Sequence, residues 1–220
     1  MSQSKTQSLR AVVFGATGLV GQEVLKELIN NKNIIKIHVV GRRPVEIQSS
    51  KIQFHLSDLE DPKKVLNVPA DFALCCLGTT MAKAKSQKAF YHVDHDLVLN
   101  AAQACVSADI RTFGFISSLG ASSKALSYYL KVKAHTEEDL KRLNFDKLVI
   151  LRPGLLLGDR QENRPLENFF KKIDPYISPF FIGPLKRYRF VHARTVAQSF
   201  IENILTSESG VLIVENEKIS

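Results

Sequence analysis

The sequence predicts an α/β fold in which helices cover both faces of one doubly wound parallel sheet. Short apolar runs of strand length alternate with segments of helical periodicity along most of the 220 residues. Three glycines follow the first apolar run directly and precede a helical pattern. The chain is long enough for one well-buried domain, and we find no internal repeat or low-complexity segment.

Each predicted strand is an apolar run bounded by polar or turn-forming residues. The runs are Leu9–Phe14, Ile34–Val40, Ile52–His55, Phe72–Leu77, Thr112–Ile116, Lys147–Leu151 and Val211–Val214. Helical periodicity predicts helices over Val20–Asn30, Val93–Val106, Leu126–Leu143, Pro165–Ile173 and Ala193–Leu205. We expect residues 1–8 to be a flexible N-terminus and residues 9–220 to form a single domain.

The stretch Asp174–Tyr188 interrupts this alternation, because prolines and a glycine stand among its aromatic residues. It therefore fits neither a regular helix nor a regular strand. We expect residues 158–192 to form a small C-terminal lid region beyond the carboxyl ends of the strands, where parallel α/β sheets bind their ligands.

A glycine-rich turn joins the first predicted strand to the first predicted helix. Its sequence, Gly15-Ala16-Thr17-Gly18-Leu19-Val20-Gly21, has the spacing G-x-x-G-x-x-G. The first glycine would make the tight turn, the second would let backbone N–H groups approach a pyrophosphate, and the third would pack helix on strand. The alternative is that the glycines form only a tight turn. In this strand–turn–helix context the pattern predicts a Rossmann-type NAD(P)-binding domain, with the phosphates at the positive end of the helix.

Two arginines follow the second predicted strand, where NAD-binding proteins commonly carry an acidic residue that holds the ribose hydroxyls. Arg42 and Arg43 can instead pair with a phosphate, and no carboxylate stands beside them to repel it. This favours NADP over NAD; the alternative is a pair of solvated loop arginines. Asp58, behind the third strand, either accepts a hydrogen bond from the adenine amino group or caps a short helix that begins near Pro62.

The fourth predicted strand leads into Leu77, Gly78 and Thr79. We expect the backbone to come close to the cofactor at Gly78, where no side chain intervenes. Thr79 or Thr80 would bind a phosphate or a ribose.

The catalytic candidates are a tyrosine and a lysine at helical spacing and a serine behind the fifth strand. Tyr129 and Lys133 share one helix face, so that the Lys133 ammonium can lower the pKa of the Tyr129 phenol and hold the nicotinamide ribose. A general acid works best when its pKa lies near the working pH. Ser118 would hydrogen-bond a substrate carbonyl and its developing alkoxide; the alternative is that Ser117 and Ser118 cap the next segment.

The composition favours a protein with an anionic small-molecule ligand. The formal net charge of +8 suits a phosphorylated cofactor, and no basic run with interleaved aromatics points to nucleic acid. The three cysteines lack metal-ligand spacing, so we expect no metal, and Cys75 and Cys76 lie in a predicted buried strand. We find no signal peptide or transmembrane segment, which predicts a cytoplasmic location.

Together these residues resemble the short-chain dehydrogenase/reductase superfamily. The glycine spacing, which is similar to that of extended and atypical members, carries the resemblance together with Ser118, Tyr129 and Lys133. The chain departs from the extended pattern at two positions. Asp94 stands where many members have an asparagine, which weakens the case for a proton relay there, and Thr195 stands where an aspartate is common.

Two further segments, Cys75–Thr80 and Arg152–Pro165, are similar to the HIV-Tat-interactive protein family of atypical reductases. The resemblance implies that NADPH is bound by Gly15–Gly21, Arg42, Arg43, Leu77, Gly78, Tyr129, Lys133, Leu155 and Arg160. Arg160 would reach back over the cofactor phosphates; the alternative is a salt bridge to Asp159 or Glu162.

The leading hypothesis is an NADPH-dependent oxidoreductase that reduces a small carbonyl compound. Tyr129 would protonate the oxygen, Lys133 would tune it, and Ser118 would orient the substrate. The alternative is a non-catalytic NADPH-binding regulatory or redox-sensing protein whose basic, aromatic segment Asp174–Arg189 binds a protein partner. A sugar-nucleotide epimerase or dehydratase is disfavoured because the C-terminal region is short. A homodimer is compatible with the sequence, which does not identify the substrate.

Overall fold

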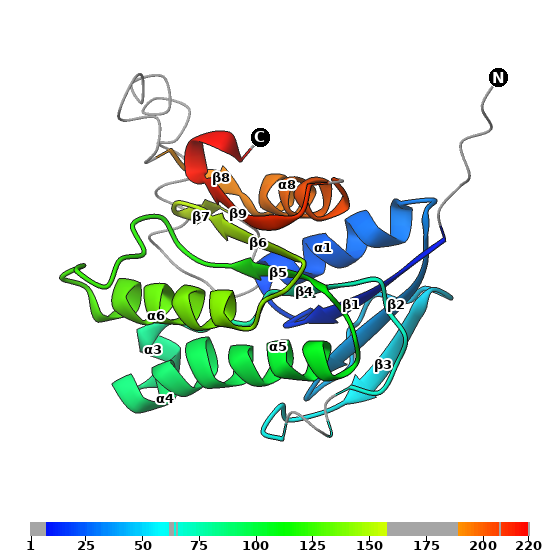
Figure 1. Cartoon of the computed structure of the whole chain (residues 1–220), viewed down its shortest axis with the longest axis horizontal. Helices are drawn as coiled ribbons and strands as arrows, with labels where there is room; N and C mark the ends of the chain where they lie inside the picture. Colours follow the sequence, from blue (N-terminus) through cyan, green and yellow to red (C-terminus); the bar gives the residue numbers. More distant parts are fainter. Residues whose placement is uncertain (1–7, 62–63, 65, 158–188, 207, 220) are drawn as a thin grey trace.

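A seven-stranded parallel sheet forms the centre of the molecule (Figure 1). The computed structural model describes residues 8–61, 64, 66–157, 189–206 and 208–219. In spatial order the strands are β3 (Ile52–Leu56), β2 (Ile34–Gly41), β1 (Leu9–Phe14), β4 (Phe72–Cys75), β5 (Thr112–Ile116), β6 (Lys147–Arg152) and β9 (Gly210–Glu215). Every neighbouring pair is parallel. This order is that of a Rossmann-type doubly wound sheet and confirms the predicted fold class.

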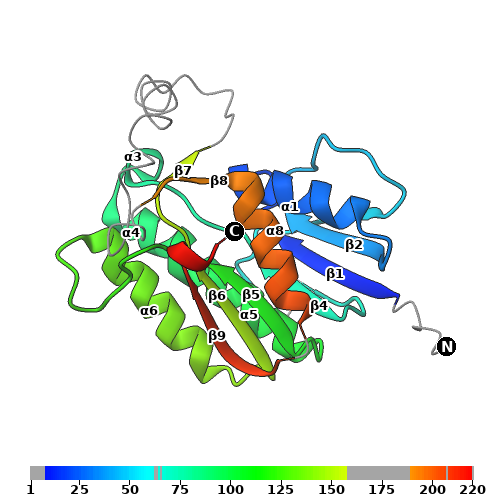
Figure 2. The same cartoon turned by 90° about the horizontal axis from the view of Figure 1, so that it is seen from above.

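Helices cover both faces of the sheet. α1 (Leu19–Asn30) and α8 (Ala193–Leu205) lie on one face, and α5 (Leu97–Ser107) and α6 (Tyr128–Arg142) lie on the other (Figures 1 and 2). We call these the α1/α8 face and the α5/α6 face. Because both are covered, the strands need no water-facing side, which is why they are almost continuously apolar in sequence.

Alternation along the strands divides their side chains between two apolar cores. On β1, Val12 belongs to the core of the α5/α6 face, whereas Val13 belongs to the core of the α1/α8 face. Packing against α8 is especially close at Gly114 on β5. A Cβ atom there would lie 2.5 Å from the ring of Phe200, so this helix rests directly on the strand.

The direction of winding reverses between β1 and β4, which are neighbours in the sheet. Doubly wound sheets have a crevice at such a point, outside the carboxyl ends of the two strands, and ligands bind there. Gly15 follows β1, and Gly78 lies three residues beyond the end of β4. The fold therefore brings the two turns predicted to hold the cofactor to one place.

Two predicted boundaries were wrong by two residues. β4 ends at Cys75 rather than at Leu77, because its ladder with β5 ends where Cys75 pairs with Phe115. α6 begins at Tyr128 rather than at Leu126, with Ser127 at its N-cap position in an extended conformation.

Periodicity also missed the short elements between β4 and α5. These are α3 (Met81–Ala84) and α4 (Gln87–Tyr91). The predicted helix Val93–Val106 begins as a π-helical turn, η1 (His92–Asp96), and continues as α5 from Leu97. The two α-helices are too short for a periodic signal, and each begins at a capping side chain. Thr80 accepts a hydrogen bond from the Lys83 N–H, and Ser86 accepts one from the Ala89 N–H. Thr80 therefore serves as a helix cap.

A two-stranded parallel sheet closes the base of the chain excursion between β6 and α8. It consists of β7 (Leu156–Leu157) and β8 (Val191–His192). The Asn216 side chain, in the 3₁₀ turn η4 (Asn216–Lys218), accepts a hydrogen bond from the Gly154 N–H at 2.7 Å. It also donates to the Arg189 carbonyl at 2.8 Å, and so ties together the two ends of the excursion.

Most of the predicted lid region over 158–192, including the segment Asp174–Tyr188, lies outside the described residues, as does the predicted helix Pro165–Ile173. The same is true of residues 1–7. Within the described part of the chain, every helix is too short or too polar to cross a membrane.

Candidate functional site

The glycine-rich turn packs against the loop that follows β4. Gly15 has a φ of +73°, in the left-handed region that favours glycine, and a Cβ atom there would lie 2.6 Å from the Cys76 carbonyl group. A Cβ atom at Gly21 would lie 2.3 Å from the Gly15 carbonyl oxygen, so α1 rests directly on the turn. Close backbone approach therefore requires glycine at the first and third positions of the motif.

The N-terminus of α1 can receive an anion. Gly18 at the N-cap position supplies no capping side chain, and the first turn carries no acidic residue. The unpaired N–H groups and the positive end of the helix dipole therefore remain available at the crevice. Ala16 and Val20 are buried, Leu19 is half-buried, and Thr17 and Gly18 are exposed. This arrangement fits the pyrophosphate of a dinucleotide.

Cationic and acidic candidates for the adenosine end of the cofactor lie at neighbouring strand ends. Arg42 and Arg43 are exposed in the bend after β2, and neither forms an ion pair with a described residue. The Ser57 N–H donates to the Gly41 carbonyl at 3.0 Å and holds the end of β3 beside that bend. The exposed Asp58 accepts a hydrogen bond at 3.1 Å from the backbone two residues further on. Its alternative role as a helix cap concerns a segment that is partly outside the described residues.

The loop after β4 lies over a buried pair of charges. A Cβ atom at Gly78 would lie 3.3 Å from Asp94 Oδ1 and 3.6 Å from Lys133 Nζ. The Thr79 N–H donates to Asp94 Oδ2 at 2.7 Å, which fixes the loop against η1. Leu77 is half-buried against the core of the α5/α6 face. Any side chain at the exposed Gly78 would therefore crowd this buried pair.

Lys133 is a buried ammonium group held by a buried carboxylate. Its Nζ lies 2.9 Å from Asp94 Oδ1, and the side chains of Lys133 and Asp94 are 4% and 0% exposed. The ammonium also donates to the Ile116 carbonyl at 3.4 Å. Burial acts to lower the pKa of Lys133, but the charge of Asp94, aided by Tyr129, outweighs it and raises the pKa above its usual value. Lys133 is therefore cationic at neutral pH.

Asp94 makes contacts that the sequence analysis did not predict. Its departure from asparagine bears on a proton relay, whereas the structure shows the carboxylate in contact with Lys133 and with the loop after β4. Asp94, Val98, Ala101 and Cys105 form one stripe at helical spacing, and all are fully buried. A carboxylate on such a stripe needs a buried partner, which is the sequence signal that could have identified it.

Tyr129 lies one helical turn before Lys133 on α6. It is half-buried, and its ring centroid lies 5.5 Å from that of Phe90. The spacing places Tyr129 and Lys133 on one face of α6, where the charge of a Tyr129 phenolate would raise the pKa of Lys133. Ser118 is half-buried two residues beyond Ile116, whose carbonyl accepts from Lys133, so β5 leads the serine to the tyrosine helix. Ser118 and the Lys133 ammonium therefore both lie at the carboxyl end of β5, and Tyr129 precedes Lys133 by one helical turn.

The neighbouring serine, Ser117, belongs to a separate buried network. Its hydroxyl donates to Glu137 Oε1 at 2.5 Å. Arg152 donates to both oxygens of Glu137, from Nε at 3.0 Å and from Nη2 at 2.6 Å. Arg152 also donates to Glu215 Oε1 at 2.8 Å, and these carboxylates raise its pKa. The Ser117 hydroxyl is therefore engaged, and Ser118 is the serine left available to a substrate.

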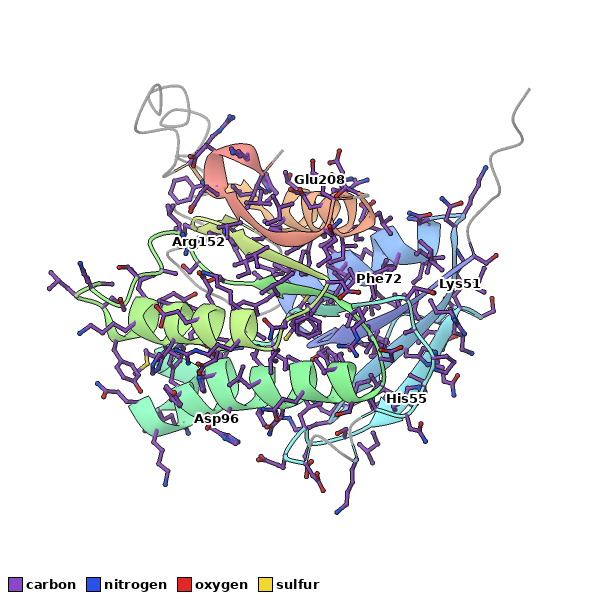
Figure 3. All side chains as sticks on the ribbon, in the orientation of Figure 1. Lys51, His55, Phe72, Asp96, Arg152 and Glu208 are labelled. Atoms are coloured by element: carbon purple, nitrogen blue, oxygen red, sulfur yellow. The ribbon has the colours of Figure 1, made fainter. Side chains whose placement is uncertain are left out.

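Sequence reasoning did not find this network, although strand alternation contains a signal for it. Ser117 continues the α5/α6-facing positions of β5 after Phe113 and Phe115, and Arg152 continues those of β6 after Ile150. Arg152 is also in register with Glu215 on β9. Figure 3 labels Arg152 at this end of the sheet. Polar residues that extend an inward-facing series predict a buried polar cluster at the strand ends.

The structure also locates Leu155 and the buried cysteines. Leu155 is 56% exposed just after β6, and Arg160 lies outside the described residues. Cys75 is buried, which raises the pKa of its thiol to about 12, and Cys105 is buried with a raised pKa as well. Such thiols act as small apolar side chains. The described part of the chain contains no cluster of His, Cys, Asp and Glu suited to a metal ion.

Comparison with known proteins decides the family. A family model described as NAD(P)H-binding matches residues 15–173, which include the glycine turn, the β4 loop and the tyrosine helix. The chain belongs to this NAD(P)H-binding family. Protein HTATIP2 of Rattus norvegicus is 31% identical over 226 residues, covering 98% of this chain and 89% of that protein. The resemblance to atypical short-chain dehydrogenases/reductases close to HTATIP2 is thereby confirmed.

Other relatives and solved structures agree with this placement. The protein named "fmp52, mitochondrial" of Emericella nidulans is 35% identical over 182 residues, covering 79% of this chain and 74% of that protein. UDP-glucose 4-epimerase of Thermotoga maritima superposes with a TM-score of 0.71 at 17% identity, covering 94% of this chain and 77% of the other. The Bordetella bronchiseptica enzyme WbmH, solved with NAD⁺, gives a TM-score of 0.71 at 13% identity, covering 94% and 75%. At such low identity these structures establish the fold alone.

Proposed function

We propose that this NAD(P)H-binding protein is an oxidoreductase that uses NADPH to reduce a small carbonyl compound. The observation that carries the proposal is the position of the buried Lys133 ammonium. It lies one helical turn from Tyr129 and directly beneath Gly78 in the cofactor loop. A protein that only bound a dinucleotide would not need a buried cation beside a tyrosine at that point.

The roles of the side chains follow from this geometry. Bound NADPH supplies the hydride that the carbonyl carbon receives. The Tyr129 hydroxyl gives its proton to the carbonyl oxygen, and the Lys133 cation favours the phenolate that is left behind. Asp94 keeps Lys133 charged and in place. Ser118 donates a hydrogen bond to the same oxygen as negative charge develops on it.

We further propose that the cofactor is NADPH rather than NADH. Arg42 and Arg43 lie exposed behind β2 without an ion-pair partner among the described residues. A 2′-phosphate would give their guanidinium groups a partner with matching geometry, which NADH lacks. The NAD⁺ in the Bordetella WbmH structure supports a nicotinamide cofactor in general but does not favour NADP.

Calorimetric titration with NADPH and NADH tests the cofactor. We expect wild-type protein to bind NADPH more tightly than NADH. The Arg42→Ala/Arg43→Ala variant should bind NADPH at least about tenfold more weakly than wild type, while its affinity for NADH should stay within about twofold of the wild-type value. Arg111→Ala is the matched control, because this exposed arginine pairs with Asp109 at the other end of the sheet. Equal binding of the two cofactors by wild-type protein would contradict the NADPH preference.

Turnover of a panel of aldehydes and ketones tests the reaction. We expect Tyr129→Phe to lower kcat by about 10²–10⁴-fold while NADPH still binds. Tyr128→Phe is the control, since the neighbouring hydroxyl donates to the Gln87 carbonyl instead. Unchanged turnover in Tyr129→Phe would disprove the proton-donor role. Tight NADPH binding without turnover of any substrate would favour the regulatory alternative.

A further inference from the structure

Two segments without acidic residues lie side by side at one end of the molecule. Residues 78–91 form the loop with α3 and α4, and residues 117–136 form the loop before α6 and its first turns. The Tyr128 hydroxyl, which donates to the Gln87 carbonyl at 3.3 Å, joins them. Figures 1 and 2 both place α3, α4 and the start of α6 together.

Exposed lysines gather on these two segments. Lys85 and Lys88 come from the first, and Lys124 and Lys131 come from the second. None of the four forms an ion pair with a described residue, whereas several exposed cations elsewhere are paired with carboxylates. These four positive charges are a large share of the formal net charge of +8. This end of the protein therefore attracts anions.

Apolar side chains stand exposed among these lysines. Leu126 is fully exposed in the loop before α6, and Met81 is 37% exposed at the start of α3. A fully exposed leucine among cations suits a binding partner whose outer layer is anionic and whose interior is apolar. Nucleic acid is a poorer partner, because the Phe90 ring is buried against Tyr128 and Tyr129 and does not offer a stacking face.

We propose that this surface binds a bilayer that contains anionic lipids. The lysines would lie among the headgroups, and Leu126 would enter the boundary between headgroups and acyl chains. We call it the lysine–leucine surface; it comprises Met81, Lys85, Lys88, Lys124, Leu126 and Lys131. It lies near the candidate site along the chain, because α3 begins two residues after Thr79, while Lys131 lies on another face of α6 from Tyr129 and Lys133. The site would then open close to the membrane.

Co-sedimentation with vesicles tests the proposal on the full chain. We expect binding to vesicles of phosphatidylcholine with about 30% phosphatidylserine, an anionic lipid, and much weaker binding to vesicles of phosphatidylcholine alone. Binding should fall as salt shortens the Debye length. Replacing Lys85, Lys88, Lys124 and Lys131 by Ser should weaken it by roughly several hundredfold, since each lysine contributes about fivefold. The control is Lys32→Ser/Ile35→Ser. It removes an exposed lysine and an exposed apolar side chain at the start of β2, at the opposite end of the sheet.

Insertion can be read out separately, because the chain contains no tryptophan. Leu126→Trp would be the single tryptophan, and its emission should shift to shorter wavelength with anionic vesicles. Ile35→Trp should show no shift. Failure of the wild-type protein to bind, equal binding to neutral vesicles, or equal loss in the Lys32/Ile35 control would overturn the proposal. Vesicle binding needs neither cofactor nor turnover, so its failure is distinct from failure of the reductase proposal.

Discussion

The two faces of the sheet bury different kinds of side chain. The α1/α8 face is mainly apolar, and its buried Lys147 serves a helix end, donating to carbonyls at the C-terminus of α8. The α5/α6 face instead encloses Asp94, Lys133 and Glu137 within its apolar core. Buried charges cost free energy unless they are paired, and even a good pair adds little stability over apolar packing.

This difference separates the part of the fold that supplies stability from the part that carries chemistry. The charged groups of the α5/α6 face lie at the carboxyl ends of β4, β5 and β6, beside the crevice. Substitutions on the apolar face should therefore change stability alone. Substitutions on the charged face should change stability and turnover together.

Phe200→Ala should have the largest effect on stability. The ring is fully buried on the α1/α8 face against Gly114, so its loss leaves a cavity and should cost about 3–5 kcal/mol of unfolding free energy. NADPH affinity of the folded protein should not change. Urea denaturation and calorimetry measure the two quantities.

Gly114→Ala provides the matched test of this contact. Alone it should overpack the site and cost about 1–3 kcal/mol. In the Phe200→Ala background it should cost much less, because the new methyl group would occupy the vacated space. Additive losses would mean that the two residues do not share this space.

Glu137→Gln should have a smaller effect on stability but should also lower turnover. The amide removes the charge that pairs with Arg152, which should cost about 2 kcal/mol. It also disturbs the hydrogen bond that fixes Ser117, next to Ser118, so we expect kcat to fall by about tenfold with a smaller change in KM. Glu138→Gln, the exposed neighbour on α6, should change neither. A loss of stability with unchanged kcat would mean that Glu137 stabilises the fold but does not contribute to turnover.

The His38–His55 pair predicts a pH dependence that belongs to the α5/α6 face. His38 is in register with Val12, and its Nδ1 lies 3.0 Å from His55 Nε2; His55 is labelled in Figure 3. Burial, with a further contribution from His55, lowers the pKa of His38 from 6.5 to about 4. Between about pH 6.5 and pH 4, His38 is therefore protonated in the unfolded chain but neutral in the folded chain.

Stability should accordingly fall as the pH drops from 6.5 towards 4, by on the order of 2 kcal/mol. Denaturation at a series of pH values measures the slope. His38→Val should flatten it, whereas His192→Asn, at an exposed position, should leave it unchanged. An equal slope in wild type and His38→Val would assign the acid sensitivity to other groups.

Local signals were enough to predict the sheet and the glycine turn. Each strand is a continuous apolar run because both faces are covered, and Gly15 and Gly21 stand where no side chain fits. The Tyr129–Lys133 pair was also predictable, because both residues lie on one turn of one helix. Long helices and strands, and motifs whose residues are close together in the sequence, can therefore be predicted from the local sequence.

The buried polar contacts were harder to predict because their partners are distant in sequence. Arg152 meets Glu137 across 15 residues and Glu215 across 63. In the sequence these residues are indistinguishable from surface charges unless strand alternation is followed to the strand ends. Asp94 and Lys133 likewise come from different helical segments that only the folded chain brings together.

The closure made by Asn216 and the β7–β8 pair has a consequence for how this protein can be remodelled. Both ends of the chain between Leu157 and Arg189 are anchored by backbone groups to one 3₁₀ turn and one short strand pair. The sheet therefore places few demands on what is inserted between these anchors. A chimaera spliced between Leu157 and Arg189 that keeps both anchors should therefore retain the seven-stranded sheet and the glycine-rich turn.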